Sequence, residues 1–427
     1  MAPARRRICL VTTFYPPYHF GGDAVFVQRL ATALAEAGHA VDVVHSVDAY
    51  RLRHPGPPPV PFIDPPGIVR HELQSRNPFW SALASQQLGR PAAYSRRLRQ
   101  LLDGDDYDVI HFHNVSLMGG PGVLRLGRAV KLYTAHEYWL VCPTHVLFAF
   151  DREACTERRC LSCTVAYKRP PQLWRATGWL AACLAEVDAL LMPSAFALEQ
   201  HRDQGIDRPM HVLPHFVPDP IPEGPAVGPA VAPGRPYFLY VGRLERLKGV
   251  EDLVRIFSTY DAADLVVVGQ GSRGEELRRQ AADLPHVRFM GPVHPSRLGP
   301  LYEGALALIA PSLCYETFGL AAAEALMHGT PVIVRRIGAL TEIVDLSGGG
   351  FTFSTAEECR AAMERLRSDP ALRAALGGRG RRAAQELWSR QAHLDRYLGI
   401  VESALAARAG ETRETRPVRR AGGGQRG

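Results

Sequence analysis

The chain has 427 residues, of which 46% are hydrophobic and 22% are charged, and its net charge is +7. This balance is typical of a folded protein of two or three domains and excludes global disorder. The segment 5–7 and the last twenty residues account for the whole excess of positive charge. The body between them is therefore neutral overall, which argues against nucleic acid as a partner.

Short apolar runs alternate with amphipathic stretches along the first half of the chain. The sequence predicts a helix at 23–38 and strands at 7–13, 40–46, 107–113, 129–136, 188–194 and 211–214. The first strand leads into Pro16 and Pro17 without a small-residue cleavage site, so it does not indicate a signal peptide. Continuous apolar runs indicate strands buried on both faces, as in parallel α/β layers.

A stretch with seven prolines and three glycines, 218–236, predicts a linker between domains covering 1–217 and 237–388. After it the alternation resumes, with helices starting at Val250, Arg273 and about Gly319, and strands at 236–242, 264–269, 286–291, 305–311, 330–334 and 350–353. We expect two Rossmann-like α/β domains that face a central cleft. A last helix at 389–407 could pack on either half, and 408–427 is predicted to be a disordered basic tail.

Five motifs in order resemble the retaining glycosyltransferases of family 4, which have the GT-B fold. They are FYPPYHFGGDAVFVQRLATALAEAGHAVDVV, VGRLERLKGV, VVVGQGSRGEEL, VRFMGPVHPSRL and PSLCYETFGLAAAEALMHGTPVI, and the resemblance covers about 8–405. It implies transfer of a sugar from a UDP- or GDP-type nucleotide-sugar to an acceptor hydroxyl, with retention and with no cofactor required for catalysis. The acceptor, whether a glycan, a lipid-linked sugar or a small molecule, is left open.

The motif E-x7-E spans Glu316 to Glu324. Glu316 precedes the helix that is predicted to start at about Gly319, and Glu324 lies within that helix. The free N–H groups at the start of a helix favour an anion, which here points to Phe318, Gly319 and Leu320 as a phosphate site. The resemblance implies that Glu316 binds the donor sugar and Glu324 the ribose. Taken alone, the two acids would be a capping residue and a solvated helix residue.

Arg243 and Lys248 follow a predicted strand at its carboxyl end, where ligands bind in doubly wound sheets. Two cations at this place can neutralise a diphosphate leaving group, and the resemblance gives the pair that role. The resemblance also places the turn at Gly269 and the segment from Arg288 to Val293 beside the donor base.

The N-terminal half supplies the residues expected on the acceptor side. Gly21, Gly22 and Asp23 form a turn before the first helix, and the resemblance places this turn near the donor phosphate and the acceptor. His136 ends a strand and is implied to contact the reacting sugar, while His113 ends the preceding strand and is predicted to line the acceptor side. A plain tight turn and structural histidines are the alternatives.

Four cysteines follow His136 with the spacing C-x12-C-x4-C-x2-C, in a predicted insertion at 139–169. They are Cys142, Cys155, Cys160 and Cys163. Four clustered thiols can supply a tetrahedral zinc site. Reduced thiols or two disulfides are the alternatives to this structural zinc.

Two other functions remain open at this stage. GQGSRG at 269–274 has the form of a dinucleotide fingerprint, but the following strand does not end in the expected acid, so an oxidoreductase is the weaker hypothesis. A non-catalytic nucleotide-sugar binder is the second. We expect a cytoplasmic protein, and the basic ends suggest peripheral contact with an anionic inner membrane face; the oligomeric state is left open.

Overall fold

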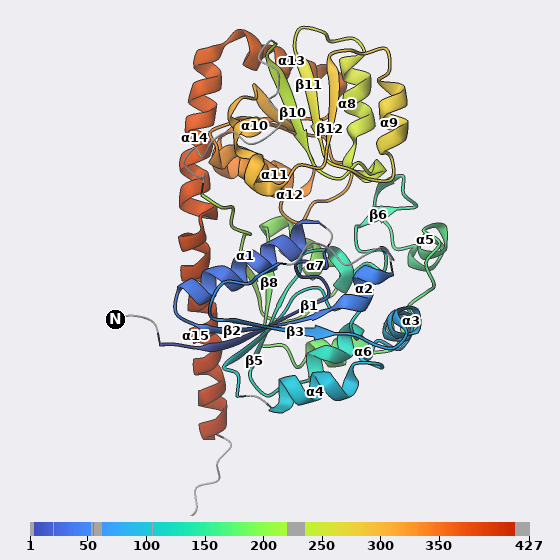
Figure 1. Ribbon diagram of the computed structural model, residues 1–427, viewed down its shortest axis with the longest axis vertical. Coiled ribbons are helices and arrows are strands. Elements are labelled where there is room, and N and C mark those ends of the chain that lie inside the picture. The colour runs from blue at the N-terminus through green and yellow to red at the C-terminus, as the bar shows by residue number, and fades with distance from the viewer. Residues whose placement is uncertain are drawn as a thin grey trace, which may run out of the picture.

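The computed structural model describes residues 4–19, 21–52, 54, 62–104, 106–219 and 235–414. They form two α/β domains, one above the other in Figure 1. Most of the predicted linker and the end of the basic tail lie outside the described residues. Each domain contains one parallel sheet, so the predicted fold class is confirmed.

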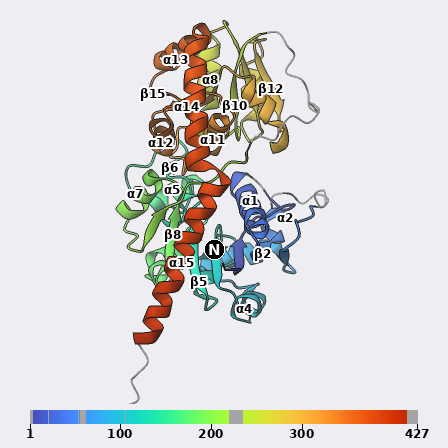
Figure 2. The ribbon, with the colours of Figure 1, turned by 90° about the vertical axis from the view of Figure 1, so that its left-hand side faces the viewer.

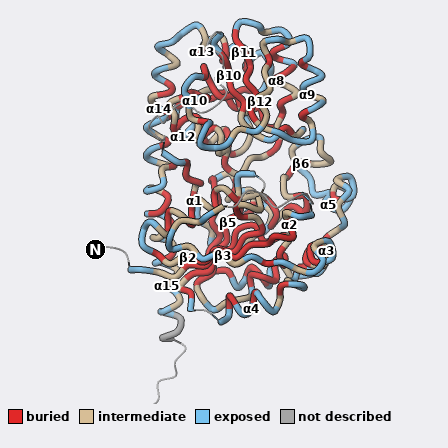
Figure 3. Tube along the Cα trace, viewed as in Figure 1, coloured by how far each residue is buried: buried red, intermediate tan, exposed pale blue. Residues whose placement is uncertain are grey.

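The N-terminal domain is built on seven parallel strands in the order β3-β2-β1-β4-β5-β8-β9. The strands are β1 (Arg7–Thr12), β2 (Ala40–Ser46), β3 (Ile68–Leu73), β4 (Val109–Phe112), β5 (Val130–Thr134), β8 (Ala189–Met192) and β9 (Met210–Val212). The central strands are buried along nearly their whole length (Figure 3). Burial on both faces explains why these strands are continuous apolar runs.

Helices cover both faces of this sheet, and short elements belong to the insertion. The helices are α1 (Gly22–Glu36), α2 (Val47–Arg51), α3 (Pro78–Leu88), α4 (Ser95–Gly104), η1 (Gly120–Arg125), η2 (Tyr138–Leu140), α5 (Cys160–Ala166), η3 (Leu173–Ala176), α6 (Trp179–Leu184) and α7 (Ala195–Asp203). The two short strands β6 (Phe148–Ala149) and β7 (Glu153–Ala154) form an antiparallel pair.

The C-terminal domain has six parallel strands in the order β12-β11-β10-β13-β14-β15. The strands are β10 (Tyr237–Val241), β11 (Asp264–Val268), β12 (Val287–Gly291), β13 (Ala307–Ala310), β14 (Val332–Arg335) and β15 (Gly350–Phe353). The helices are η4 (Arg246–Lys248), α8 (Val250–Phe257), α9 (Gly274–Gln280), η5 (Pro295–Arg297), α10 (Gly299–Glu303), α11 (Leu320–Met327), α12 (Gly338–Ser347), α13 (Ala356–Ser368) and α14 (Pro370–Trp388).

A last helix, α15 (Arg390–Glu414), returns from the C-terminal domain to the N-terminal one (Figure 2). Its residues Leu394, Tyr397 and Val401 are buried in the core that contains β1, so it packs on the N-terminal half. The helix is longer than the predicted 389–407. Residues 408–414 are helical rather than disordered, and Arg408 pairs with Asp188 at 3.2 Å. Within the described ranges, no helix is both long and apolar enough to cross a membrane.

Candidate active site between the two domains

Glu316 lies at the centre of the donor side, in the loop between β13 and α11. Its carboxylate accepts hydrogen bonds from Lys248 Nζ and Ser312 Oγ, both at 2.5 Å. Burial disfavours the ionised form of Glu316, but the Lys248 ammonium, the Ser312 hydroxyl and the charge of Arg243 outweigh it, so the pKa of Glu316 lies below its usual range. The structure thus brings together two segments that are far apart in the sequence, 243–248 and 312–316.

Arg243 lies in the loop after β10, which packs closely against the loop after β11. The residue is exposed, and its charge acts on both Glu316 and Asp23 of the other domain. The loop beneath it touches the turn at Gly269, where an added Cβ would lie 1.8 Å from the Gly242 carbonyl oxygen. The glycines of this turn therefore allow close packing against the Arg243 loop.

The first turn of α11 points its N–H groups toward the same region. Gly319, immediately before the helix, has a φ of 108°, and an added Cβ would lie 2.7 Å from Leu340. Only glycine suits this position, and the helix start is open to an anion. The Phe318 side chain is buried against Trp388 and His215. These contacts anchor the loop between β13 and α11.

Glu324, four residues into α11, is engaged by both domains. Its carboxylate pairs with Arg29 of α1 at 3.1 Å and accepts a hydrogen bond from Tyr302 Oη at 3.0 Å. All three residues line a cavity of about 30 Å³. A ribose diol that binds Glu324 would have to share the carboxylate with Arg29, a partner that the spacing E-x7-E does not reveal.

Direct hydrogen bonds place the Glu316 loop against the N-terminal domain. Thr317 Oγ1 donates to the carbonyl oxygen of His136 at 2.8 Å, and Tyr138 Oη donates to the carbonyl oxygen of Glu316 at 3.2 Å. Glu342 of α12 accepts hydrogen bonds from the N–H groups of Ala195 and Phe196, both at 3.0 Å. An acid of one domain therefore caps a helix of the other, and the carboxyl ends of the two sheets are held face to face.

His136 lies between two other histidines at the carboxyl edge of the N-terminal sheet. His136 Nε2 is 2.8 Å from His113 Nδ1, and His136 Nδ1 is 3.1 Å from His215 Nε2. Burial lowers the pKa of His136 to about 4, so its ring is neutral at pH 7. The two neighbouring imidazoles fix the orientation of the ring.

The prediction that His113 lines the acceptor side is wrong in this structure. His113 is fully buried, and its Nδ1 is occupied by His136. The sequence placed it correctly after β4 but did not show that the segment before the linker and α15 cover that strand end. The His113 ring thus supports the ring of His136.

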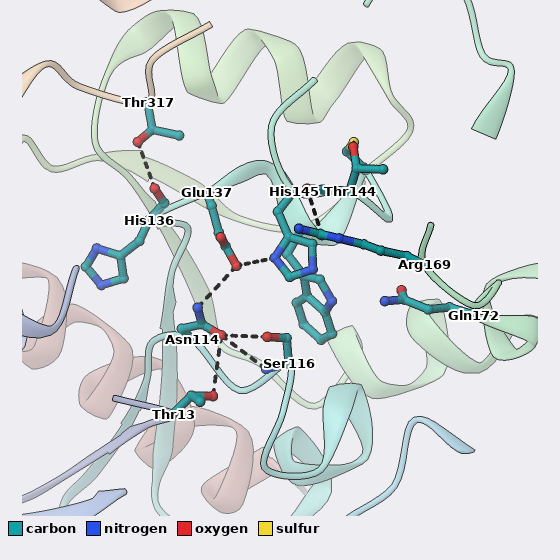
Figure 4. Close-up of polar contacts among 12 residues, drawn as sticks. Thr13, Asn114, Ser116, His136, Glu137, Thr144, His145, Arg169, Gln172 and Thr317 are labelled. Atoms are coloured by element: carbon teal, nitrogen blue, oxygen red, sulfur yellow. Dashed lines mark hydrogen bonds and ion pairs between the residues drawn. The ribbon is translucent and has the colours of Figure 1, made fainter. Parts of the chain in front are cut away.

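A polar network next to His136 was not predicted (Figure 4). Glu137 accepts hydrogen bonds from His145 Nδ1 at 2.6 Å and from Asn114 Nδ2 at 3.2 Å. Burial opposes its ionisation, but His145, Arg169 and His136 together keep the pKa of Glu137 below its usual range. Residues Glu137 and Asn114 follow adjacent strands, which is the signal that would have drawn attention to them.

Asp23 faces this network from the start of α1. Its carboxylate accepts a hydrogen bond from the N–H of Ala24 at 2.9 Å. Burial and the charge of Glu137 raise the pKa of Asp23 to about 6. The neighbouring Gly22 lies close to Leu320 of α11, so the turn at 21–23 is near the start of that helix.

We expect Asp23→Asn to stabilise the protein at neutral pH. The pKa of Asp23 rises from its usual 3.8 to about 6 on folding, so the ionised carboxylate that is present at neutral pH costs folding free energy. The free energy of unfolding of the variant should exceed that of the wild type at pH 7.5, and the gain should shrink as the pH falls toward 4. Urea unfolding at several pH values measures this. The exposed Asp345→Asn variant should show no such trend; an equal trend in both would contradict the prediction.

Arg288 does not fit its predicted place beside the donor base. It lies in the first half of β12 and pairs with Asp264, the first residue of β11, at 2.9 Å. Ligands of parallel sheets bind at the opposite, carboxyl end. The motif gave the right strand but not the end of the strand at which the side chain lies. Val293 follows the carboxyl end of β12, where the predicted contact stays a prediction.

The four cysteines of the insertion are free thiols that line a single cavity. Among the described residues, no group of three or more histidine, cysteine or acidic side chains converges on a point that could hold a metal ion. The sulfur atoms thus surround a space without forming a closed coordination shell.

Two family models match successive parts of the chain. The model of Glycosyltransferase Family 4 matches residues 20–219, and that of Glycosyl transferases group 1 matches residues 235–369. D-inositol 3-phosphate glycosyltransferase of Pseudarthrobacter chlorophenolicus is 25% identical over 94% of this chain and 98% of its own. Glycogen synthase of Mycobacterium tuberculosis is 29% identical over 95% of this chain and 96% of its own.

Solved structures agree on the fold. Sucrose-phosphate synthase from Thermosynechococcus elongatus superposes with a TM-score of 0.70 at 22% identity, over 94% of this chain and 100% of that one. Anabaena HepE in complex with UDP and glucose superposes with a TM-score of 0.65 at 14% identity, over 93% of this chain and 100% of that one. The solved structures show the GT-B fold, and the two family models and the named relatives identify the chain as a glycosyltransferase. The chain is of the family 4 type, and the oxidoreductase hypothesis is not favoured.

Proposed function

We propose that the protein transfers a sugar from a nucleoside-diphosphate-sugar to an acceptor hydroxyl with retention of configuration. The observation that carries this proposal is the Lys248–Glu316 ion pair at the start of α11, beside Arg243 and opposite His136. It brings two cations, an acid and free helix N–H groups to one place between the domains. These are the groups that a sugar diphosphate requires.

Each donor group has a partner in this arrangement. Arg243 and Lys248 face the diphosphate and stabilise the charge that develops as the nucleoside diphosphate leaves. Glu316 binds hydroxyls of the sugar, the N–H groups of Gly319 and Leu320 bind phosphate, and Glu324 binds the ribose. The two cations supply the positive charge at the leaving group, so turnover should not require added Mg²⁺ or Mn²⁺.

In the transfer step, residues of the N-terminal domain meet the donor that is held by the C-terminal domain. His136, held by His113 and His215, contacts the reacting sugar from the N-terminal domain. The acceptor enters beside Gly21, Gly22 and Asp23 and attacks on the face from which the diphosphate leaves, with the leaving phosphate taking its proton. Retention then needs no covalent intermediate.

A thermal-shift panel of nucleoside diphosphates and nucleotide-sugars tests the donor class. A bound donor raises the melting temperature by mass action, so one base and one sugar should stand out. The anomeric configuration of the transferred sugar, followed by NMR, then tests retention. An inverted product would refute the retaining mechanism, and a bound donor that is never transferred would favour a non-catalytic binder.

We infer that the acceptor side docks on an anionic membrane, as a lipid-linked acceptor would require. The segment 73–104, which includes α3 and α4, contains five arginines and one acidic residue, Asp103. At its start, Phe79 and Trp80 are 57% and 63% exposed. Exposed aromatic side chains beside arginines suit a lipid interface. The basic ends should attract an anionic membrane less than their composition suggests, because Arg6 pairs with Glu402 and Arg408 pairs with Asp188.

Vesicle co-sedimentation distinguishes the two basic regions. We expect the double substitution Phe79→Ser and Trp80→Ser to lower binding to anionic vesicles at least tenfold, while deletion of 415–427 has a smaller effect. Binding of a nucleoside diphosphate should be unchanged in both variants. Loss of vesicle binding only in the deletion would assign the contact to the tail instead.

A further inference from the structure

The insertion after His136 has little hydrophobic core of its own. Its helix α5 buries only Thr164, and Leu161 and Val165 are 68% and 60% exposed. Its strands β6 and β7 are two residues each. Segments this small need a cross-link or a metal to hold one conformation.

The backbone of the insertion is also the least relaxed in the described chain. All five described non-glycine residues with positive φ lie within it, with values of 45° to 78°: His145, Leu147, Phe150, Asp151 and Lys168. Such conformations persist only where the surroundings fix them. The side chains of Leu147 and Phe148 are buried, so packing fixes the first part of the insertion, whereas α5 buries only Thr164 and lacks such support.

The four thiols are close enough to one another to cross-link the insertion and so fix its backbone. Cys142, Cys155, Cys160 and Cys163 line one cavity of about 20 Å³, the size of a single small group. The N–H of Phe150 donates to Cys163 Sγ at 3.4 Å, so the backbone at 150 is tied to this thiol. Arg175 lies within electrostatic range of Cys142 and Cys160, and its positive charge would offset part of the charge of a four-thiolate site.

We propose that these four cysteines bind a zinc ion that cross-links the insertion. Zinc is the ion that four cysteines including a C-x2-C pair most often hold, with each sulfur about 2.3 Å away. The sulfur atoms do not yet converge, so binding must draw them inward. Cys160 is exposed at the start of a helix with few core contacts, which leaves that helix free to move toward the ion.

The cross-link has a consequence for the active site. His145, in the insertion, donates to Glu137, and its carbonyl oxygen accepts the N–H of Tyr138 at 3.0 Å. Glu137 directly follows His136. The zinc site would therefore act as a positioning device for the acceptor side, a role that rests on the proposed function, whereas zinc binding itself does not.

Metal content and hydrogen exchange of the full chain test the proposal. Protein purified under reducing conditions should contain about one zinc per chain, lost in Cys160→Ser and Cys163→Ser but kept in Cys183→Ala, whose buried thiol lies outside the insertion. Amide exchange over 137–145 should accelerate at least tenfold in the zinc-free variants. Both readouts are independent of sugar transfer, so they distinguish failure of this site from failure of the proposed function.

Three results would overturn the assignment. One is a reduced protein without metal, and another is iron with sulfide in place of zinc. The third is disulfides among the four thiols of the native protein. Zinc binding with unchanged exchange over 137–145 would overturn the positioning role.

Discussion

Replacing Lys248 by alanine is expected to lower kcat by about 10²- to 10³-fold. The ammonium forms the 2.5 Å contact with Glu316 and stands beside the proposed diphosphate, so its loss removes positive charge at the point where negative charge develops. Release of nucleoside diphosphate from the donor measures the effect. The folded state should survive, because Lys248 lies in the short η4 turn and is not part of a hydrophobic core.

Arg246, two residues before Lys248, offers a matched control. Arg246 belongs to the same η4 element but is exposed. If catalysis depends on the charge beside Glu316 and not on the net charge of the loop, Arg246→Ala should leave kcat within about twofold of the wild type. Turnover that is unchanged in Lys248→Ala, or equally reduced in both variants, would refute the assignment of the diphosphate site.

Glu316→Gln is expected to lower kcat by about 10²-fold or more with little change in melting temperature. The amide keeps the shape of the side chain and can still accept the hydrogen bond from Ser312, but the charge that pairs with Lys248 is lost. The sugar hydroxyls then meet a weaker acceptor, and Lys248 is left without its partner.

The double variant separates a shared site from two independent ones. Because the two side chains are in contact, the losses in Lys248→Ala and Glu316→Gln should be strongly non-additive. Losses that multiply fully, or a Glu316→Gln enzyme as fast as the wild type, would contradict a common role at the donor.

Much of the fold could be predicted because buried parallel strands are continuous apolar runs. The runs RICLVT and YFLYV became β1 and β10 within a residue or two of the prediction. The edge strand β3, IVRHEL, was missed because three consecutive polar residues, 70–72, interrupt its short apolar run. The length of α15 was underestimated because its stabilising contacts, such as Arg408 with Asp188, come from the other domain.

The site could be predicted where it depends on strand ends and helix starts. Glu316, Arg243 and Lys248 were found in this way, and their catalytic roles stay predictions. The burial of His113 depends on tertiary packing and could not be predicted, whereas the place of Arg288 near the amino end of its strand follows from the predicted strand at 286–291. The contacts of Glu137 with His145 and of Glu324 with Arg29 join segments that no local pattern connects.

Calorimetric titration of the nucleoside diphosphate selected by the thermal-shift panel tests the central claim most directly. The account predicts one binding site per chain in the wild type, affinity reduced at least tenfold in Lys248→Ala, and wild-type affinity in Arg246→Ala. Equal affinity in all three proteins, or no binding of any nucleoside diphosphate, would contradict the claim that the space between the two domains at Lys248 and Glu316 is the donor site.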